Sequence, residues 1–243
     1  MVPIQSQHET RRIPVMTWLL VAVNAIVFFY ELQLSDPALN QFILRWGVVP
    51  SQILQAFHHP LAAGSLHAYV TLLTSQFIHG GWLHIVGNML FLLIFGNDIE
   101  ARLGSGLYLL FYLVCGIIAG IVEVLMVAPI FGALNEPSIG ASGAIAGVLG
   151  AYLILYPLHR VVVLVPILII PIPLVLPAFV LIGWWFIQQL LYGILSLSPS
   201  VAQSGGVAFW AHVGGFLAGI ILILLFAGSR PRNTWANAPY GQY

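Results

Sequence analysis

Long apolar segments alternate with shorter polar stretches along the whole sequence. A helix that crosses the hydrocarbon core of a bilayer, about 30 Å thick, takes about 20 mainly apolar residues. The pattern therefore predicts an all-α membrane protein with six transmembrane helices. The predicted spans are residues 14–34, 82–96, 106–127, 141–156, 176–194 and 207–227.

Two connections between these spans are unusually apolar. Residues 35–76 are too hydrophobic for a solvated loop and too interrupted to span, so we expect a long interfacial loop between the first two helices. Trp46 and Tyr69 would lie at the level of the lipid headgroups. Residues 161–175 carry three prolines and are followed by Pro177, so we expect an irregular or interfacial piece there.

The basic residues give an orientation. Six spans place both termini on one side of the membrane, and all seven basic residues are arginines. With the N-terminus in the cytoplasm, Arg45 is external, and the arginines at 11, 12, 102, 160, 230 and 232 are cytoplasmic. This positive-inside bias predicts cytoplasmic tails at 1–13 and 228–243 around one membrane domain at 14–227.

The composition agrees with a membrane protein and excludes other classes. The chain is 60% hydrophobic and only 6% charged, unlike soluble domains. Its formal net charge is zero and it has no basic patch, so a nucleic-acid partner is not expected. The single cysteine, Cys115, cannot form an internal disulfide. Because no cleavable signal or targeting extension is evident, we expect a prokaryotic cytoplasmic membrane.

Ser142 places a hydroxyl at the start of an apolar span. The span 141–156 would be about 24 Å long as a helix, which is shorter than the hydrocarbon core, so one end is expected below the membrane surface. Gly140 and Gly143 flank the serine and would let another backbone come close. Taken alone, this segment favours helix packing over catalysis.

The second span carries further polar side chains at its outer end. His84 and Asn88 are four residues apart and share one helix face, with His79 one or two turns farther out. Polar residues inside spans are costly and indicate function. Hydrogen bonds between helices are the alternative for His84 and Asn88. His79 could equally orient His84 or hold a loop in place.

The sixth span contributes His212 at a similar depth. Glycines at 143 and 147 on the fourth span, and at 215 and 219 on the sixth, would let these two helices pack closely. We therefore predict that His212 reaches the hydroxyl of Ser142 within about 2.6–3.2 Å. The alternative for His212 is a packed histidine that bonds to a backbone carbonyl.

These groups predict nucleophilic catalysis. A neutral imidazole can take the proton of a serine hydroxyl near neutral pH. No aspartate lies within a predicted span, and Glu123 has no evident path to His212, so we expect a Ser–His pair without a carboxylate. The oxyanion would be bound by the side chains of His84 and Asn88 and by the backbone N–H of Ser142 at a helix N-terminus.

The other titratable residues receive structural interpretations. The histidines at 58, 59 and 67 are expected at the interface, because their spacing does not match a metal site and the chain has no His-Glu-x-x-His motif. Glu100 and Arg102 are expected to form a structural pair at the cytoplasmic end of the second span. Neither a metal nor an organic cofactor is implied.

The three motifs, in this order, resemble the rhomboid family of intramembrane serine proteases. The segment Gly140-Ala141-Ser142-Gly143 is similar to the nucleophile motif of that family. The general-base helix is matched by Ala211, His212, Gly215 and Gly219, and the second-helix motif at the oxyanion pocket by His79, His84 and Asn88. The resemblance covers nearly the whole chain and implies the compact six-helix form.

The resemblance also implies a substrate class. It implies hydrolysis of peptide bonds in or near membrane segments of single-pass proteins, which enter sideways from the bilayer. Trp184, Trp185 and Phe186 on the fifth span are expected to face lipid, and that helix could move aside to admit a substrate. Many bacterial members have a tyrosine four residues after the serine, where this chain has Ala146, so we expect another apolar or aromatic side chain against His212.

Two functions from other classes remain as alternatives. A non-catalytic rhomboid-like binding or chaperone protein would normally lack the serine or the histidine, and both are present. A small transporter would more naturally carry charged residues at the midplane of the membrane, where this chain has almost none.

Overall fold

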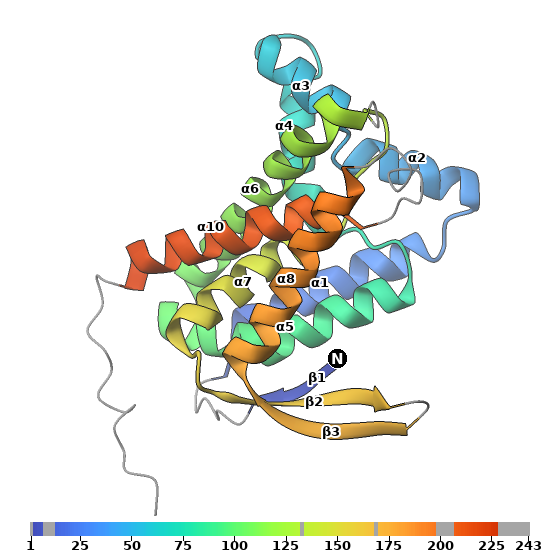
Figure 1. Ribbon diagram of the computed structural model, residues 1–243. Coiled ribbons are helices and arrows are strands. Elements are labelled where there is room, and N and C mark those ends of the chain that lie inside the picture. Colours follow the sequence, from blue (N-terminus) through green and yellow to red (C-terminus); the bar gives the residue numbers. More distant parts are fainter. Residues whose placement is uncertain (1, 7–12, 132–133, 168–169, 198–206, 228–243) are drawn as a thin grey trace, which may run out of the picture.

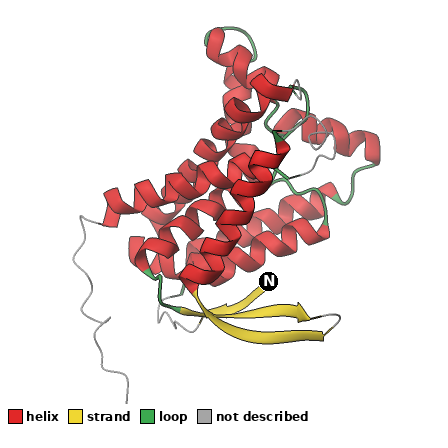
Figure 2. Ribbon diagram, in the orientation of Figure 1, coloured by secondary structure: helices red, strands yellow, loops and turns green. Residues whose placement is uncertain are grey.

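The computed structural model describes residues 2–6, 13–131, 134–167, 170–197 and 207–227. The described chain is mainly helical, with a small sheet at one end (Figures 1 and 2). Its helices are α1 (Val15–Glu31), α2 (Asp36–Trp46), α3 (Pro50–His58), α4 (Ser65–Thr74), η1 (Ser75–Phe77), α5 (Trp82–Leu103), α6 (Ser105–Phe131), α7 (Ser142–Leu155), α8 (Ala178–Ser196) and α10 (Phe209–Ala227). Its strands are β1 (Val2–Ser6), β2 (Arg160–Ile167) and β3 (Ile170–Pro177).

The short helix α7 lies at the centre of the bundle. It contacts α5, α6, α8 and α10, and its residues from Gly143 to Tyr152 are all buried. Small residues dominate its first half, so neighbouring helices can approach its backbone closely. The aromatic side chains of Phe95, Tyr108 and Tyr112 fill the core on the side of α5 and α6.

The predicted glycine contact between the fourth and sixth spans is confirmed. A Cβ atom on Gly215 would overlap the carbonyl oxygen of Gly143, and one on Gly219 would overlap that of Gly147. The backbones of α7 and α10 therefore meet directly, without side chains between them. This contact fixes the position of α10 relative to the start of α7.

Four of the described helices are long and apolar enough to cross a membrane: α5, α6 (over Ser105–Val127), α8 and α10 (over Phe209–Phe226). Two shorter apolar helices, α1 and α7, coincide with the remaining predicted spans. The predicted tail at 228–243 and the arginines at 11, 12, 230 and 232 lie outside the described residues.

The second predicted span was too short. Residue 96 does not end the helix, because α5 continues to Leu103 and carries Asp98 and Glu100 in buried positions. Glu100 accepts hydrogen bonds from the backbone N–H groups of Met16 and Thr17 and from the hydroxyls of Thr17 and Ser105. A charged residue with such partners can stay inside a helix bundle, which hydropathy alone does not reveal.

The predicted interfacial loop at 35–76 is mostly helical. Helices α2, α3 and α4 lie at one end of the molecule (Figure 1). A small apolar cluster holds α3 and α4 against α6, and its members include Ile53, Leu72 and Val124. The isolated bridge between Val48 and Ser138 joins this region to the segment before α7.

The sheet corrects the all-α prediction. Strands β2 and β3 form an antiparallel hairpin, and β1, from the predicted N-terminal tail, pairs with β2. The β-branched run Val161–Val163 favours a strand. The prolines at 171, 173 and 177 lie in β3, which is an edge strand, where a missing N–H donor is tolerated. These three prolines, taken as signs of irregular structure, were therefore compatible with an edge strand, and Pro166 lies in β2 beyond the residues paired with β1.

Candidate active site

Ser142 and His212 meet at the contact between α7 and α10. The Oγ atom of Ser142 and the Nε2 atom of His212 are 2.7 Å apart, within the predicted range. Ser142 is the first residue of α7 and is half-buried, whereas His212 is buried near the start of α10. The backbone contact at Gly215 holds the two helices at this separation.

His84 lies beside the backbone that leads into Ser142. Gly140 has a φ of 125°, and a Cβ atom there would lie 2.7 Å from Nε2 of His84 and 3.7 Å from Oγ of Ser142. The backbone N–H of Gly80 donates to Nδ1 of His84 at 3.3 Å. In a neutral ring the proton then lies on Nε2, the nitrogen that faces Gly140. His84 thus presents an N–H donor next to the serine hydroxyl.

Asn88 lies one helical turn farther along α5. Its side chain is buried, and its Nδ2 atom has no hydrogen-bond partner within the described part of the chain. A buried amide with an unused donor is costly unless a ligand or water completes it. The prediction that His84 and Asn88 share one helix face is consistent with their positions on α5.

His79 lies in the segment between η1 and α5, packed against His84. The two rings meet edge to face with centroids 5.0 Å apart. The backbone N–H of His79 donates to the carboxylate of Glu31, with both oxygens at 3.3 Å. Burial, together with His84, lowers the pKa of His79 to about 4, so its ring is neutral at physiological pH. These contacts fit both roles weighed for His79, orienting His84 and fixing the loop.

Gln189 is a residue of the candidate site that the sequence did not predict. Its Oε1 atom lies 2.8 Å from Nδ1 of His212, on the opposite edge of the ring from Ser142. Gln189 belongs to α8 and is buried. A glutamine in an apolar helix was a visible signal, but the sequence offered no means to assign its partner.

The ring that packs against His212 comes from α8. Trp185 has its ring centroid 5.7 Å from that of His212, at an interplanar angle of 40°. Phe186 stacks on Phe216 with centroids 4.3 Å apart. The expected lipid-facing position is compatible with the exposure of Trp184 and wrong for Trp185 and Phe186, which pack against the core. An apolar or aromatic neighbour for His212 was expected because position 146 is an alanine, and Trp185 is that neighbour.

Glu123 contacts the helix that carries His212. Its Oε2 atom accepts the backbone N–H of Ala211 at 2.8 Å, at the N-terminus of α10. Glu123 thus reaches the backbone of the residue that directly precedes His212, a contact that the sequence did not reveal. The carboxylate fixes the start of α10 without contacting the ring nitrogens that bond to Ser142 and Gln189.

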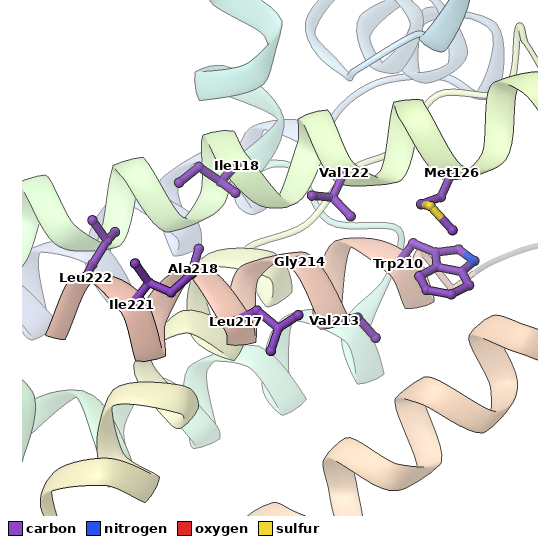
Figure 3. A pocket seen from close by; sticks show the side chains of 10 residues that line it. All are labelled: Ile118, Val122, Met126, Trp210, Val213, Gly214, Leu217, Ala218, Ile221 and Leu222. Atoms are coloured by element: carbon purple, nitrogen blue, oxygen red, sulfur yellow. The ribbon is translucent and has the colours of Figure 1, made fainter. Parts of the chain in front are cut away.

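A separate apolar pocket of about 410 Å³ lies between α6 and α10 (Figure 3). Its lining includes Ile118, Val122 and Leu217 and contains no charged residue. Ser142 and His212 do not line it. Among the described residues, no group of three His, Cys, Asp or Glu side chains is placed to hold a metal ion.

Comparison with known proteins identifies the family. The family model described as Rhomboid domain matches residues 66–229, which include Ser142 and His212. The chain belongs to the rhomboid family. It is an integral membrane protein with several membrane-spanning helices.

Curated rhomboid relatives are similar over part of their length. RHOMBOID-like protein 4 of Arabidopsis thaliana is 30% identical over 70% of this chain and 37% of its own length. Rhomboid protease GluP of Bacillus subtilis is 33% identical over 58% of this chain and 24% of its own length. Rhomboid protein 1, mitochondrial, of Saccharomyces cerevisiae is 26% identical over 63% of this chain and 40% of its own length. The matches thus span less than half of each of these relatives.

Proposed function

We propose that the chain is an intramembrane serine endopeptidase with Ser142 as nucleophile and His212 as general base. The observation that carries this proposal is the 2.7 Å separation of Oγ and Nε2. In the reaction, the hydroxyl proton passes to Nε2 as Oγ attacks the scissile carbonyl carbon. His212 then gives that proton to the leaving amine, which leaves an acyl-enzyme. Water attacks the acyl carbon while His212 takes one of its protons, and His212 returns this proton to Oγ as the ester bond breaks.

The oxyanion of the tetrahedral intermediate requires hydrogen-bond donors. We assign this role to Nε2–H of His84, the side-chain amide of Asn88 and the backbone N–H of Ser142. The last group lies at the N-terminus of α7, where the helix dipole also favours negative charge. The unused amide donor of Asn88 supports this assignment, because an oxyanion would complete it.

The family and the position of the site support a proposal for the substrate class. We propose that single-pass transmembrane proteins are cleaved in or near their membrane segments. A helical carbonyl is shielded by its own hydrogen bond and turn, so the substrate must unwind locally to reach Ser142. Water must also reach this residue, and its half-buried position supports a site that opens at one membrane face.

The topology completes the proposal. We propose six membrane-spanning helices, with α1 and α7 as the short ones, and both termini in the cytoplasm. Arg45 lies in the α2–α4 region. Arg102 lies in the last turn of α5, and Arg160 is the first residue of β2. The positive-inside bias then places the α2–α4 end, and with it the opening of the site, on the external face.

The experiment compares purified variants on a transmembrane substrate in proteoliposomes. We expect cleavage by the wild type and a loss of about 10³-fold or more in kcat for Ser142→Ala and for His212→Ala. A fluorophosphonate probe should label the wild type and not Ser142→Ala. The matched controls Ser35→Ala and His59→Ala change exposed residues and should cleave like the wild type.

Two outcomes would contradict the proposal. A wild type that neither cleaves nor takes up the probe, although folded in the membrane, would favour the non-catalytic alternative. Cleavage by Ser142→Ala or His212→Ala at the wild-type rate would refute the assignment of these residues.

A further inference from the structure

We infer that Gln189 is a positioning residue that holds His212 in the tautomer and orientation required of a general base. This inference rests on the proposed function of Ser142 and His212. It assigns the third position of a hydrogen-bonded chain, Ser142–His212–Gln189, to a neutral amide. The third member comes from α8, a different helix from the other two.

The contact with Gln189 determines which ring nitrogen of His212 carries the proton. An amide oxygen can only accept a hydrogen bond, so the 2.8 Å contact to Oε1 requires the proton of His212 to lie on Nδ1. In a neutral ring Nε2 is then free of hydrogen. The hydroxyl of Ser142 therefore donates to Nε2 across 2.7 Å, which is the arrangement that lets the ring accept the proton.

Two side chains of α8 fix the orientation of the His212 ring. Trp185 and Gln189 are four residues apart and lie on the same face of α8. Trp185 packs against the ring of His212, and Gln189 bonds to its edge. One face of α8 therefore limits both rotation and displacement of the imidazole.

Burial strengthens the hydrogen bond between Gln189 and His212. Gln189 and His212 are each 9% exposed, so water competes little for their hydrogen bond. When His212 takes the proton of Ser142, the oxygen of Gln189 stabilises the positive ring through its dipole. A glutamine provides this without a buried carboxylate, which would need a partner of its own when the ring is neutral.

The experiment uses three variants of the full chain in proteoliposomes. Gln189→Met keeps the length and volume of the side chain but removes the acceptor, whereas Gln189→Glu keeps an acceptor oxygen. Gln188→Met is the matched control on the neighbouring position of α8. For each we measure kcat and KM on a transmembrane substrate, the rate of fluorophosphonate labelling of Ser142, and the thermal midpoint.

The expected order of activity distinguishes positioning from packing. Gln189→Met should lower kcat and the labelling rate about 3- to 10-fold with little change in KM, which is the effect of one neutral hydrogen bond. Gln189→Glu should be more active than Gln189→Met, and Gln188→Met should match the wild type. If the contact only fills space, Met should serve at least as well as Glu, because a buried carboxylate is costly.

Several results would overturn the inference. One is a Gln189→Met protein with wild-type kcat, and another is a Met variant more active than the Glu variant. If Gln189→Met does not fold, Gln189→Asn replaces it, since it keeps the amide and withdraws it by one methylene; wild-type kcat in that variant would also refute the inference. An inactive wild type would instead refute the proposed function, so the two failures are distinguishable.

Discussion

At the scale of single residues, the approach to Ser142 depends on the backbone at Gly140. Its φ of 125° lies in the region that favours glycine. Its N–H donates to the carbonyl of Ser75 at 2.9 Å, which fixes the segment just before α7. The ring of His84 occupies the space where a side chain at position 140 would lie. Gly140 therefore sets how closely His84, the proposed oxyanion donor, and Ser142, the proposed nucleophile, approach one another.

Gly140→Ala should lower the activity of the site. Its Cβ atom would lie 2.7 Å from Nε2 of His84, so the ring must move away from the serine. We expect kcat on a transmembrane substrate to fall by at least about tenfold, the effect of losing one well-placed hydrogen bond in the transition state. Gly64→Ala is the matched control, because Gly64 also has a positive φ, 94°, but no atom lies within 4 Å of its Cβ position. Equal activity losses in both variants would show that backbone strain, and not the collision with His84, is responsible.

Some contacts of the candidate site could be predicted from the sequence and others could not. The pairing of Ser142 with His212 could be predicted, because glycine spacing on both helices and a shared depth in the membrane limit their arrangement. Gln189 could not, because its bond to His212 depends on how α8 rotates about its own axis. The aromatic run on α8 has the same difficulty, since one residue of rotation decides whether Trp184 or Trp185 faces the bundle.

At the scale of elements, two buried carboxylates stabilise helix N-termini that belong to other segments. Glu100 on α5 accepts the N–H groups of Met16 and Thr17 at the start of α1. Glu123 on α6 accepts the N–H of Ala211 at the start of α10. Free N–H groups and the helix dipole make such ends favourable places for negative charge. Each acid therefore joins two helices at a defined height.

Glu123→Leu should destabilise the start of α10 and disturb His212, the next residue after Ala211. Loss of a cap costs about 0.5–2 kcal/mol, so we expect a lower thermal midpoint in detergent together with reduced kcat. Glu123→Gln keeps an acceptor oxygen and should have the smaller effect on both. Glu136→Gln changes an exposed acid and serves as the control. A Glu123→Leu protein with unchanged midpoint and unchanged kcat would show that the cap is dispensable.

The elements that the sequence did not predict have physical reasons in common. Asp98 and Glu100 lie in the end of α5, although hydropathy places such acids outside a membrane span. The prolines of β3 lie in a strand, although proline is unfavourable in most strand positions. Their partners come from distant segments, α1 for Glu100 and β1 for the hairpin of β2 and β3. Hydropathy and local propensity contain no information on such partners, whereas the six apolar segments themselves could be located from periodicity and length.

At the scale of the whole molecule, α7 connects two ends of the protein that differ in structure, one formed by α2, α3 and α4 and the other by the sheet. The segment before α7 bonds to Ser75 and to Val48, so the N-terminus of α7 lies at the end formed by α2, α3 and α4. The C-terminus of α7 leads into β2 at the opposite end, where the sheet lies (Figure 1). The end of α7 that carries Ser142 and the sheet should therefore face opposite sides of the membrane.

Cysteine accessibility tests this arrangement. Ala62 lies in the exposed turn before α4, and Leu158 lies in the turn between α7 and β2 and is 75% exposed. A membrane-impermeant maleimide should label Ala62→Cys in intact cells and label Leu158→Cys only after the membrane is permeabilised. The native Cys115 is buried, so the unmodified chain provides the background. Labelling of both positions from the same side would contradict the crossing of α7, and labelling with the sides exchanged would place the opening at Ser142 on the cytoplasmic face.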